Sequence, residues 1–317
     1  MLTALNENHK LINLLDGIPK KQKFFCPACK SEVRLRCGPI KIPHFAHLSL
    51  EVCEVWSENE SEQHLSLKKA IYDWVKPYEK VEVEKYLPEL NQTPDLLINN
   101  KIAIEIQCSR LSIKRLKERT DTYRKYGYYV VWMLGKDLWL SDRISPLQKQ
   151  FLYFSQNLGF YYWELDLTKK CLRVKYMIHE NLKGKLTCLE KDFSFSRENF
   201  LKVLGFPFQC CKLERLQVKV DRDLKAYIQR ELFHRNPKWM KLQEDLYFRG
   251  KNLLTESFPV QWAPIGSNIL TGNLEMQFLQ IRDDLPAYYK VFRDYYTKNS
   301  QKTLFPPAYL LKYWNVN

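Results

Sequence analysis

The sequence predicts a mixed α/β fold, and three observations near the middle of the chain carry that prediction. Apolar residues alternate on both sides of Asn99-Asn100, which indicates two short strands joined by a turn. Helical patterns flank this hairpin, and a continuous apolar run of strand length follows. In order, the predicted elements are a helix at 58–76, strands at 81–84 and within 92–107, a helix at 109–126 and a buried strand at 128–134.

The register of the hairpin follows from its apolar residues. If they share one buried face, Leu96 lies opposite Ile104, which leaves a three-residue loop at 99–101. The same register places Asp95 opposite Glu105 on the other face. Directly opposed residues have Cβ atoms roughly 4.5–5.5 Å apart, so these two carboxylates repel unless a cation lies between them.

The opposed acids therefore predict a site for Mg²⁺ or Mn²⁺, which prefer carboxylate oxygens. The alternative is an exposed polar face without a ligand. Pro94 before the Asp and Gln107 in the same polar row favour the metal site over that alternative.

Pro94-Asp95 followed by Glu105-x-Gln107 resembles the PD-(D/E)XK nuclease signature, with Gln in place of the usual Lys. More closely, roughly the first half of the chain resembles the competence protein CoiA family. The motifs that carry this resemblance are Glu60-Ser61-x-x-His64, Glu105-Ile-Gln-Cys-Ser109, the helix with Arg119 and Tyr123, Val130-Val-Trp-Met-Leu134, Cys26-x-x-Cys29 and His44-Phe-Ala-His47.

The resemblance implies a restriction-endonuclease-like αβββαβ core with a catalytic metal site. Glu60, at the start of the first helix, is the acid expected to complete that site, with the carbonyl of Ile106 as a further ligand. Gln107 brings no charge, so Lys68 or Arg119 is expected to supply it. The expected catalytic residues are Asp95, Glu105, Gln107, Glu60, His64 and Lys68, with Asp95, Glu105 and Glu60 as the Mg²⁺ or Mn²⁺ ligands. For His64, a partly buried structural histidine is the alternative.

The N-terminal segment predicts a zinc ribbon. Cys26-Pro-Ala-Cys29 is a metal-binding knuckle, and a short β excursion leads from it to His44 and His47. Two thiolates and two imidazoles select Zn²⁺. The histidines are closer together than in common zinc fingers, so Cys37 or Cys53 could replace one of them. A redox CxxC is the other interpretation, but the strand-then-helix context that it needs is missing.

Composition sets the class of protein but not its partner. Nine cysteines, an odd number, do not suggest a disulfide framework, and no signal peptide or apolar run of membrane-spanning length is evident; we expect a reduced, cytoplasmic protein without a membrane span. The net charge is +14, and residues 1–110 hold 15 basic and 15 acidic residues, so the whole excess follows the hairpin. Such charge suits DNA binding but does not establish it.

We expect three domains: a zinc-ribbon-like β module at 1–57, the nuclease-like domain at 58–165, and a mainly α-helical region at 166–317 that binds DNA or a partner. Within them the patterns also indicate an edge strand at 138–140, a helix at 148–158 and a hairpin around 168–170. Aromatic rows from residue 196 onward are typical of core packing, with single-strand stacking as the alternative. Cys210 and Cys211 are expected to be structural thiols.

The residues together predict phosphodiester chemistry, and the family resemblance implies the pathway. We expect a metal-dependent DNA nuclease that processes incoming single-stranded or branched DNA for recombination in natural transformation, with recombination proteins as partners. Lys114, Arg115, Arg119 and Tyr123 are the expected DNA contacts. The main alternative is a non-catalytic DNA-binding accessory protein that keeps the nuclease fold. A zinc-ribbon regulator of duplex DNA is a third, more distant one.

Overall fold

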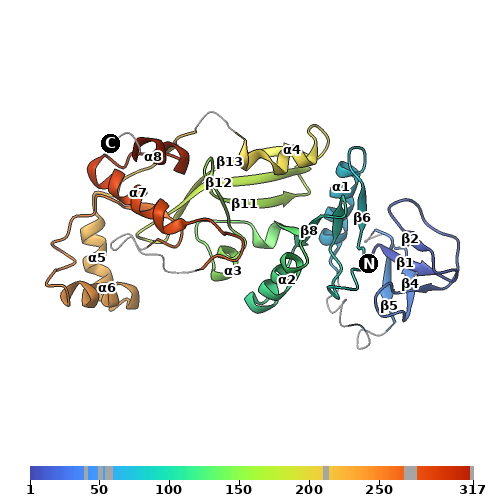
Figure 1. The fold of residues 1–317 in the computed structure, drawn as a ribbon. Coiled ribbons are helices and arrows are strands. Elements are labelled where there is room, and N and C mark those ends of the chain that lie inside the picture. The colour runs from blue at the N-terminus through green and yellow to red at the C-terminus, as the bar shows by residue number, and fades with distance from the viewer. Residues whose placement is uncertain (39–41, 49–52, 54–59, 210–213, 268–276, 315–317) are drawn as a thin grey trace.

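The computed structural model describes residues 1–38, 42–48, 53, 60–209, 214–267 and 277–314, and all structural statements concern these residues. Among them, no helix is long and apolar enough to cross a membrane. Figure 1 shows a small N-terminal sheet at one end of the molecule and a large mixed sheet in the middle. A pair of helices, α5 (Leu224–Phe233) and α6 (Pro237–Tyr247), lies at the other end. The predicted thiols Cys210 and Cys211 lie outside the described residues.

The N-terminal sheet has the strand order β2-β1-β3-β4-β5, and every neighbouring pair is antiparallel. Its core is small and is built around Phe24, Phe45 and the buried Cys26. Its strands are β1 (Thr3–Asn6), β2 (Leu11–Asn13), β3 (Phe24–Phe25), β4 (Glu32–Arg36) and β5 (His44–His47).

The central part has the predicted order of a helix, three antiparallel strands, a helix and a parallel strand. The mixed fold and the αβββαβ core are therefore confirmed. The elements are α1 (Glu62–Val75), β6 (Val81–Val83), β7 (Leu96–Ile98), β8 (Ile102–Gln107), α2 (Ile113–Lys125) and β9 (Tyr129–Leu134).

Local sequence explains where these elements begin and turn. Ser61 and Ser112 cap α1 and α2, each accepting a hydrogen bond from the third backbone N–H that follows. The first helix thus begins after Glu60, later than the pattern predicted. Asn99 and Asn100 adopt positive φ values of 51° and 53° in the hairpin loop.

The sheet continues well beyond β9, with the order β13-β12-β11-β9-β8-β7-β6. The boundary expected between residues 165 and 166 lies inside the β11–β12 hairpin, so the sheet crosses it. β10 pairs with β11, and β15 pairs with β12. These strands are β10 (Tyr153–Ser155), β11 (Gly159–Asp166), β12 (Cys171–Asn181), β13 (Leu186–Ser194) and β15 (Trp262–Pro264).

Two local predictions in this region are wrong. Residues 138–140 do not form a strand, since Lys136–Leu138 is a short 3-10 helix, η2. The helix predicted at 148–158 is confined to α3 (Pro146–Lys149), because the aromatic residues after it pair with β11 as a strand. Short apolar segments carry too little periodicity to separate the two states.

Helices dominate from residue 200 onward, and the aromatic rows there are mostly core. Tyr288, Tyr289, Phe292 and Tyr296 of α7 are all buried. Tyr288 packs against Phe154 and Tyr289 against Phe160, both aromatic side chains of the sheet. The elements are α4 (Phe200–Leu204), η3 (Phe206–Phe208), β14 (Leu216–Gln217), α5 (Leu224–Phe233), α6 (Pro237–Tyr247), α7 (Leu285–Lys298), β16 (Thr303–Leu304) and α8 (Pro307–Trp314).

The buried His179 of β12 makes the stability of the fold sensitive to acid. Burial lowers the pKa of its imidazole to about 4, and the ring donates through Nδ1 to the carbonyl of Met177 at 2.6 Å. The unfolded chain takes up this proton near pH 6.5, whereas the native state does not, so stability is present above pH 6.5 and is lost as the pH falls toward 4. The loss from this group is about 3 kcal/mol. Urea unfolding from pH 7 to 4 should show a flatter pH dependence for His179→Gln; parallel curves would contradict the assignment.

Candidate functional site

The β7–β8 hairpin has the predicted register, with Leu96 paired to Ile104 and Ile98 to Ile102. Asp95 immediately precedes β7, and its Oδ2 accepts a hydrogen bond of 2.7 Å from the backbone N–H of Ile106. Asp95 and Glu105 are both buried. The hairpin therefore fixes one carboxylate of the site through its own backbone.

Helix α1 brings a histidine to Asp95, and the residue before its N-cap brings a second carboxylate. His64 Nε2 lies 3.1 Å from Asp95 Oδ2, and His64 Nδ1 lies 3.4 Å from Glu60 Oε1. One ligand atom from each of the three residues falls within 4.8 Å of the others, close enough to hold one metal ion. Two of the three expected metal ligands, Glu60 and Asp95, are thus brought together.

Lys68, one turn beyond His64 on α1, supplies positive charge to this group. Its side chain is completely buried, its Nζ forms ion pairs with Glu60 and Glu84, and it lies 3.5 Å from Asp95 Oδ1. Glu84 is not among the site residues that the sequence predicts. It follows β6 and adopts a positive φ of 47°. The alternating Val-Glu-Val-Glu pattern placed it on a strand but gave no sign of its partner.

Glu84 also connects the N-terminal sheet to the site. Its Oε2 accepts hydrogen bonds from the backbone N–H groups of Leu2 and Thr3, at 2.6 and 3.1 Å. The Met1 ammonium lies 2.5 Å from Glu60 Oε2. The strand β1 therefore packs directly against the carboxylate cluster.

These charges set the ionisation of the cluster. Burial acts to raise the pKa values of Glu60 and Asp95, but Lys68 and His64 outweigh it and hold both below their usual range. Burial acts to lower the pKa of His64, but Asp95 and Glu60 raise it above 6.5 overall. Both carboxylates are consequently ionised at neutral pH, as metal ligands must be.

Glu105 has different partners from Asp95. Its Oε1 accepts hydrogen bonds from Arg119 Nη2 at 2.5 Å and from the Tyr123 hydroxyl at 2.6 Å. Burial raises its pKa, which the Arg119 charge opposes and the Asp95 charge supports. Glu105 is not part of the three-residue group around His64. Its role as a metal ligand stays a prediction.

The remaining expected residues lie in different surroundings. Gln107 Nε2 donates to the carbonyl of Ser109 at 3.0 Å. Tyr123 is fully buried, Arg119 lies over the ring of Trp132, and both contact Glu105. Their contact with DNA stays a prediction. Lys114 is exposed and Arg115 half-buried on α2, and their contact with DNA stays a prediction.

A second cluster of metal-ligand side chains forms in the N-terminal sheet. Cys26, Cys29, His47 and Cys53 offer ligand atoms that all lie within 4.8 Å of one another. Three sulfurs and one imidazole suit tetrahedral Zn²⁺. Burial raises the pKa of the Cys26 thiol to about 12, so a bound cation is what would stabilise its thiolate.

His44 is the expected ligand that this cluster lacks, and Cys53 stands in its place. Successive side chains of a strand point to opposite faces, so residues three apart cannot share one face. On β5, His47 lies on the same face as the buried Phe45, whereas His44 lies with Ala46 and turns its Nδ1 to the Ile42 carbonyl at 3.0 Å. The sequence did not predict a strand at these residues, so it could not exclude the pair by itself.

Two known family models match the two parts of the chain that hold these clusters. Residues 60–204 match the model described as "Competence protein CoiA, nuclease-like domain", and residues 7–56 match "Competence protein CoiA, N-terminal domain". Together the two models span more than half of the chain. The chain belongs to the competence protein CoiA family.

One curated relative illustrates how far the similarity extends. The chain is 33% identical over 138 residues to "Competence protein CoiA" of Bacillus subtilis (strain 168). The match covers 42% of this chain and 35% of that protein, so only about a third of the relative's length is aligned. No solved structure matches the chain.

Replacing the proposed fourth zinc ligand should remove bound zinc. We expect Cys53→Ser to lose most of the metal, because three ligands cannot close a tetrahedral site, and His44→Gln to retain about one equivalent. Metal content of the purified variants, measured by plasma mass spectrometry, checks both. Zinc lost from His44→Gln and kept in Cys53→Ser would reverse the ligand assignment.

Removing the hydroxyl that supports Glu105 should destabilise the protein. Tyr123→Phe leaves a buried carboxylate with one fewer donor, at a cost of about 2 kcal/mol. Tyr128→Phe is the matched control, because its hydroxyl bonds Glu89 in an exposed position, and it should change stability by less than about 0.5 kcal/mol. Urea denaturation measures the free energy of unfolding of both variants. Equal losses of stability would show that the hydrogen bond to Glu105 contributes no more than the exposed bond to Glu89.

Proposed function

We propose that this member of the CoiA family is a divalent-metal-dependent nuclease that hydrolyses DNA phosphodiester bonds. The observation that supports it most is the convergence of Glu60, His64 and Asp95 on one point. Two ionised, largely buried carboxylates beside a basic side chain form an arrangement typical of phosphoryl-transfer sites. The nuclease-like family match over residues 60–204 supports the same chemistry.

The donor atoms fit Mg²⁺ or Mn²⁺. Carboxylate oxygens from Glu60 and Asp95 suit these hard cations, and few protein ligands suffice because such ions keep several waters. Glu105 enters the set if its carboxylate turns from Arg119. A bound ion supplies Lewis-acid stabilisation of charge on the phosphate and lowers the pKa of water.

The chain's own residues supply the other requirements. Lys68 is held at the cluster by Glu84 and lies 3.5 Å from Asp95, so it provides the positive charge that Gln107 lacks. His64 Nε2 holds a proton at the edge of the site, 3.1 Å from Asp95. Arg119 and Tyr123 fix the orientation of Glu105.

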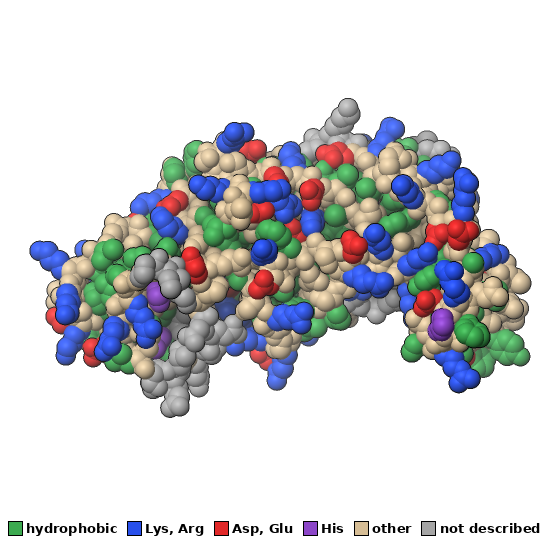
Figure 2. All heavy atoms as spheres, turned by 180° about the vertical axis from the view of Figure 1, so that it is seen from behind, with side chains coloured by type: hydrophobic (Ala, Val, Ile, Leu, Met, Phe, Trp, Pro, Cys, Tyr) green, Lys and Arg blue, Asp and Glu red, His purple; other side chains and the backbone are tan. Residues whose placement is uncertain are grey.

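The DNA is proposed to approach along α2. Lys114 and Arg115 follow the N-cap of this helix, and Arg119 of the same helix contacts Glu105. Figure 2 shows Lys and Arg side chains spread over one whole face of the molecule, so overall charge attracts DNA without defining a path. Single-stranded or branched DNA in the cytoplasm during natural transformation is the proposed substrate, with recombination proteins as proposed partners.

The N-terminal sheet is proposed to be a structural zinc module. Its metal cluster fixes strands whose apolar core is small. Because β1 donates backbone hydrogen bonds to Glu84, order in this module is transmitted to Lys68. Zinc then supports the nuclease site without taking part in the reaction.

A non-catalytic DNA-binding accessory protein is the second candidate. Gln107 turns to the Ser109 carbonyl, and Lys68 already neutralises part of the carboxylate cluster. Such a protein would keep the fold and the basic surfaces but would not cut DNA.

Cleavage assays separate the two candidates. End-labelled single-stranded, duplex and branched DNA are incubated with Mg²⁺ or Mn²⁺ and with EDTA. Asp95→Asn keeps the shape of the side chain but removes a charged ligand, so cleavage should fall at least about 100-fold, by analogy with the loss of one key electrostatic group. Asp73→Asn is the matched control, since Asp73 is exposed on α1 and pairs with Lys69.

Each outcome of the cleavage assay favours a different candidate function. Cleavage by the wild type and by Asp73→Asn, absent in Asp95→Asn and in EDTA, supports the nuclease and its site together. DNA binding without cleavage on any substrate favours the accessory protein. Equal cleavage by all three proteins would place the activity elsewhere or in a contaminant.

A further inference from the structure

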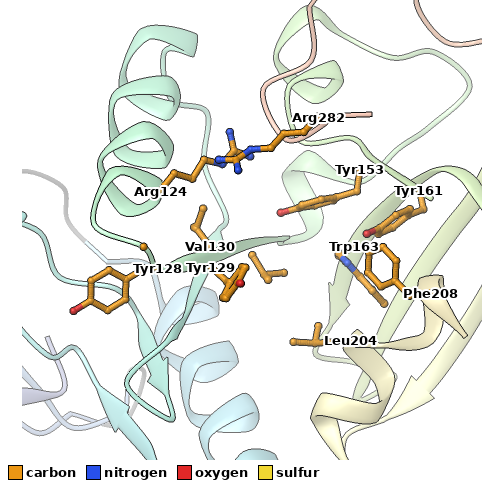
Figure 3. A pocket seen from close by; sticks show the side chains of 12 residues that line it. Arg124, Tyr128, Tyr129, Val130, Tyr153, Tyr161, Trp163, Leu204, Phe208 and Arg282 are labelled. Atoms are coloured by element: carbon orange, nitrogen blue, oxygen red, sulfur yellow. The ribbon is translucent and has the colours of Figure 1, made fainter. Parts of the chain in front are cut away.

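A cavity of about 490 Å³ lies at the start of β9 and shares no lining residue with the carboxylate cluster. This volume is in the usual range for sites that bind a small molecule or part of a larger one, about 300–1,000 Å³. Figure 3 shows the cavity between the end of α2, the start of β9, the β10–β11 hairpin and the α4–η3 segment. It is lined by Arg124, Gly127, Tyr128, Tyr129, Val130, Val131, Tyr153, Tyr161, Trp163, Leu204, Phe208 and Arg282.

Aromatic rings form most of its walls. Tyr153 and Tyr161 stack with ring centroids 5.4 Å apart and planes tilted by 22°, and Trp163 packs edge-on against Tyr161. Tyr129 and Phe208 at the rim are 67% and 68% exposed. Exposed rings beside a buried aromatic wall offer stacking surfaces for a flat ligand.

Two arginines converge over these rings. Figure 3 shows the guanidinium groups of Arg124 and Arg282 side by side at one edge of the cavity. Arg124 is fixed by donating to the carbonyl of Leu279 at 2.6 Å and to Gln280 Oε1 at 3.1 Å. Within the described part of the chain, no carboxylate lies within 4.0 Å of either guanidinium. Asp121 acts on Arg124 and Asp283 on Tyr161 only from a greater distance, so two adjacent positive charges without a directly paired acid favour an anionic ligand.

Two polar groups of the wall have no hydrogen-bond partner among the described residues, the indole N–H of Trp163 and the phenol hydroxyl of Tyr161. Figure 3 shows both side chains at the cavity. Both groups can therefore donate to a ligand with acceptor atoms.

We infer that this cavity binds one nucleotide unit of single-stranded DNA, with the base against the aromatic wall and the phosphate between Arg124 and Arg282. The inference rests on the proposed nuclease function and extends it to how substrate is held. Helix α2 links the two places: Arg119 contacts Glu105 at the site, and Arg124, near its end, lines the cavity. Residues 119 and 124 are five positions apart, about 7.5 Å along the helix axis, so one strand can reach both.

Binding is measured without cleavage, by fluorescence anisotropy of labelled oligo(dT) of about 12 nucleotides, in EDTA and in the Asp95→Asn background. Phe208→Ala removes an exposed stacking surface and Arg282→Ala removes an exposed phosphate contact. Each should weaken binding about tenfold, as expected for losing one stacked base or one charged contact.

Matched controls remove equivalent side chains elsewhere. Phe233→Ala deletes an aromatic ring that is 82% exposed on α5, and Arg249→Ala deletes an exposed positive charge after α6. Both should stay within about twofold of the parent, because neither lines the cavity. Equal losses in Arg282→Ala and Arg249→Ala would reduce the effect to net charge and overturn the inference.

Two further measurements test the base and its place. An oligonucleotide of the same length made entirely of abasic sites keeps the phosphates and should bind about tenfold more weakly than oligo(dT). If both bind with equal affinity and inorganic phosphate competes with them, the cavity is an anion site only and the inference is overturned. Photocrosslinking of 5-iodouracil oligonucleotide should label Tyr129, Trp163 or Phe208, and labelling confined to other residues would also overturn it.

Failure of this inference is separable from failure of the proposed nuclease. If the wild type never cuts DNA but its binding depends on the cavity residues, the cavity is supported as a DNA-binding site and the proposed nuclease activity is rejected. Asp95-dependent cleavage that is unchanged by Phe208→Ala and Arg282→Ala, with unchanged binding, supports the nuclease and removes the cavity.

Discussion

The buried ammonium of Lys68 is the interaction on which the rest of the structure depends. It lies among three carboxylates that come from separate segments, Glu60 before α1, Glu84 after β6 and Asp95 before β7. Removing one member of such a buried network leaves an unpaired charge, which costs about 3–5 kcal/mol. The same contacts that hold helix, sheet and N-terminal strand together also form the candidate site, so stability and chemistry share one set of residues.

Asp95 and Glu105, the two acids of the hairpin, differ in ionisation because their neighbours differ. Asp95 is held ionised by His64 and Lys68, whereas burial raises the pKa of Glu105 against the charge of Arg119. Both are buried in the same hairpin, yet one faces a group of metal ligands and the other a guanidinium and a phenol. A substrate or metal that draws Glu105 from Arg119 would join the two halves of the site.

The sheet extends this site toward the rest of the molecule. Trp132 of β9 lies in register with Glu105, and its backbone N–H donates to the hydroxyl of Tyr153, whose ring lines the aromatic cavity. Strands β10 to β13 therefore extend the sheet beyond the αβββαβ core and build one wall of the aromatic cavity. Arg124 and Arg282, far apart in sequence, meet where the segment before α7 contacts α2, because Leu279 and Gln280 accept hydrogen bonds from Arg124.

The sequence by itself determined the αβββαβ order and the hairpin register, and it pointed to Glu60, His64, Lys68 and Asp95 as members of the candidate site. These follow from local periodicity, turn chemistry and family motifs. His44 is excluded as a partner of His47 only by the strand that the structure shows at 44–47, since residues three apart on a strand point to opposite faces. Only the tertiary structure decided that Cys53 joins Cys26, Cys29 and His47, that Glu84 fixes Lys68 and that Arg119 and Tyr123 turn inward to Glu105. Those contacts join segments far apart in the chain, and their geometry is set by packing rather than by any local pattern.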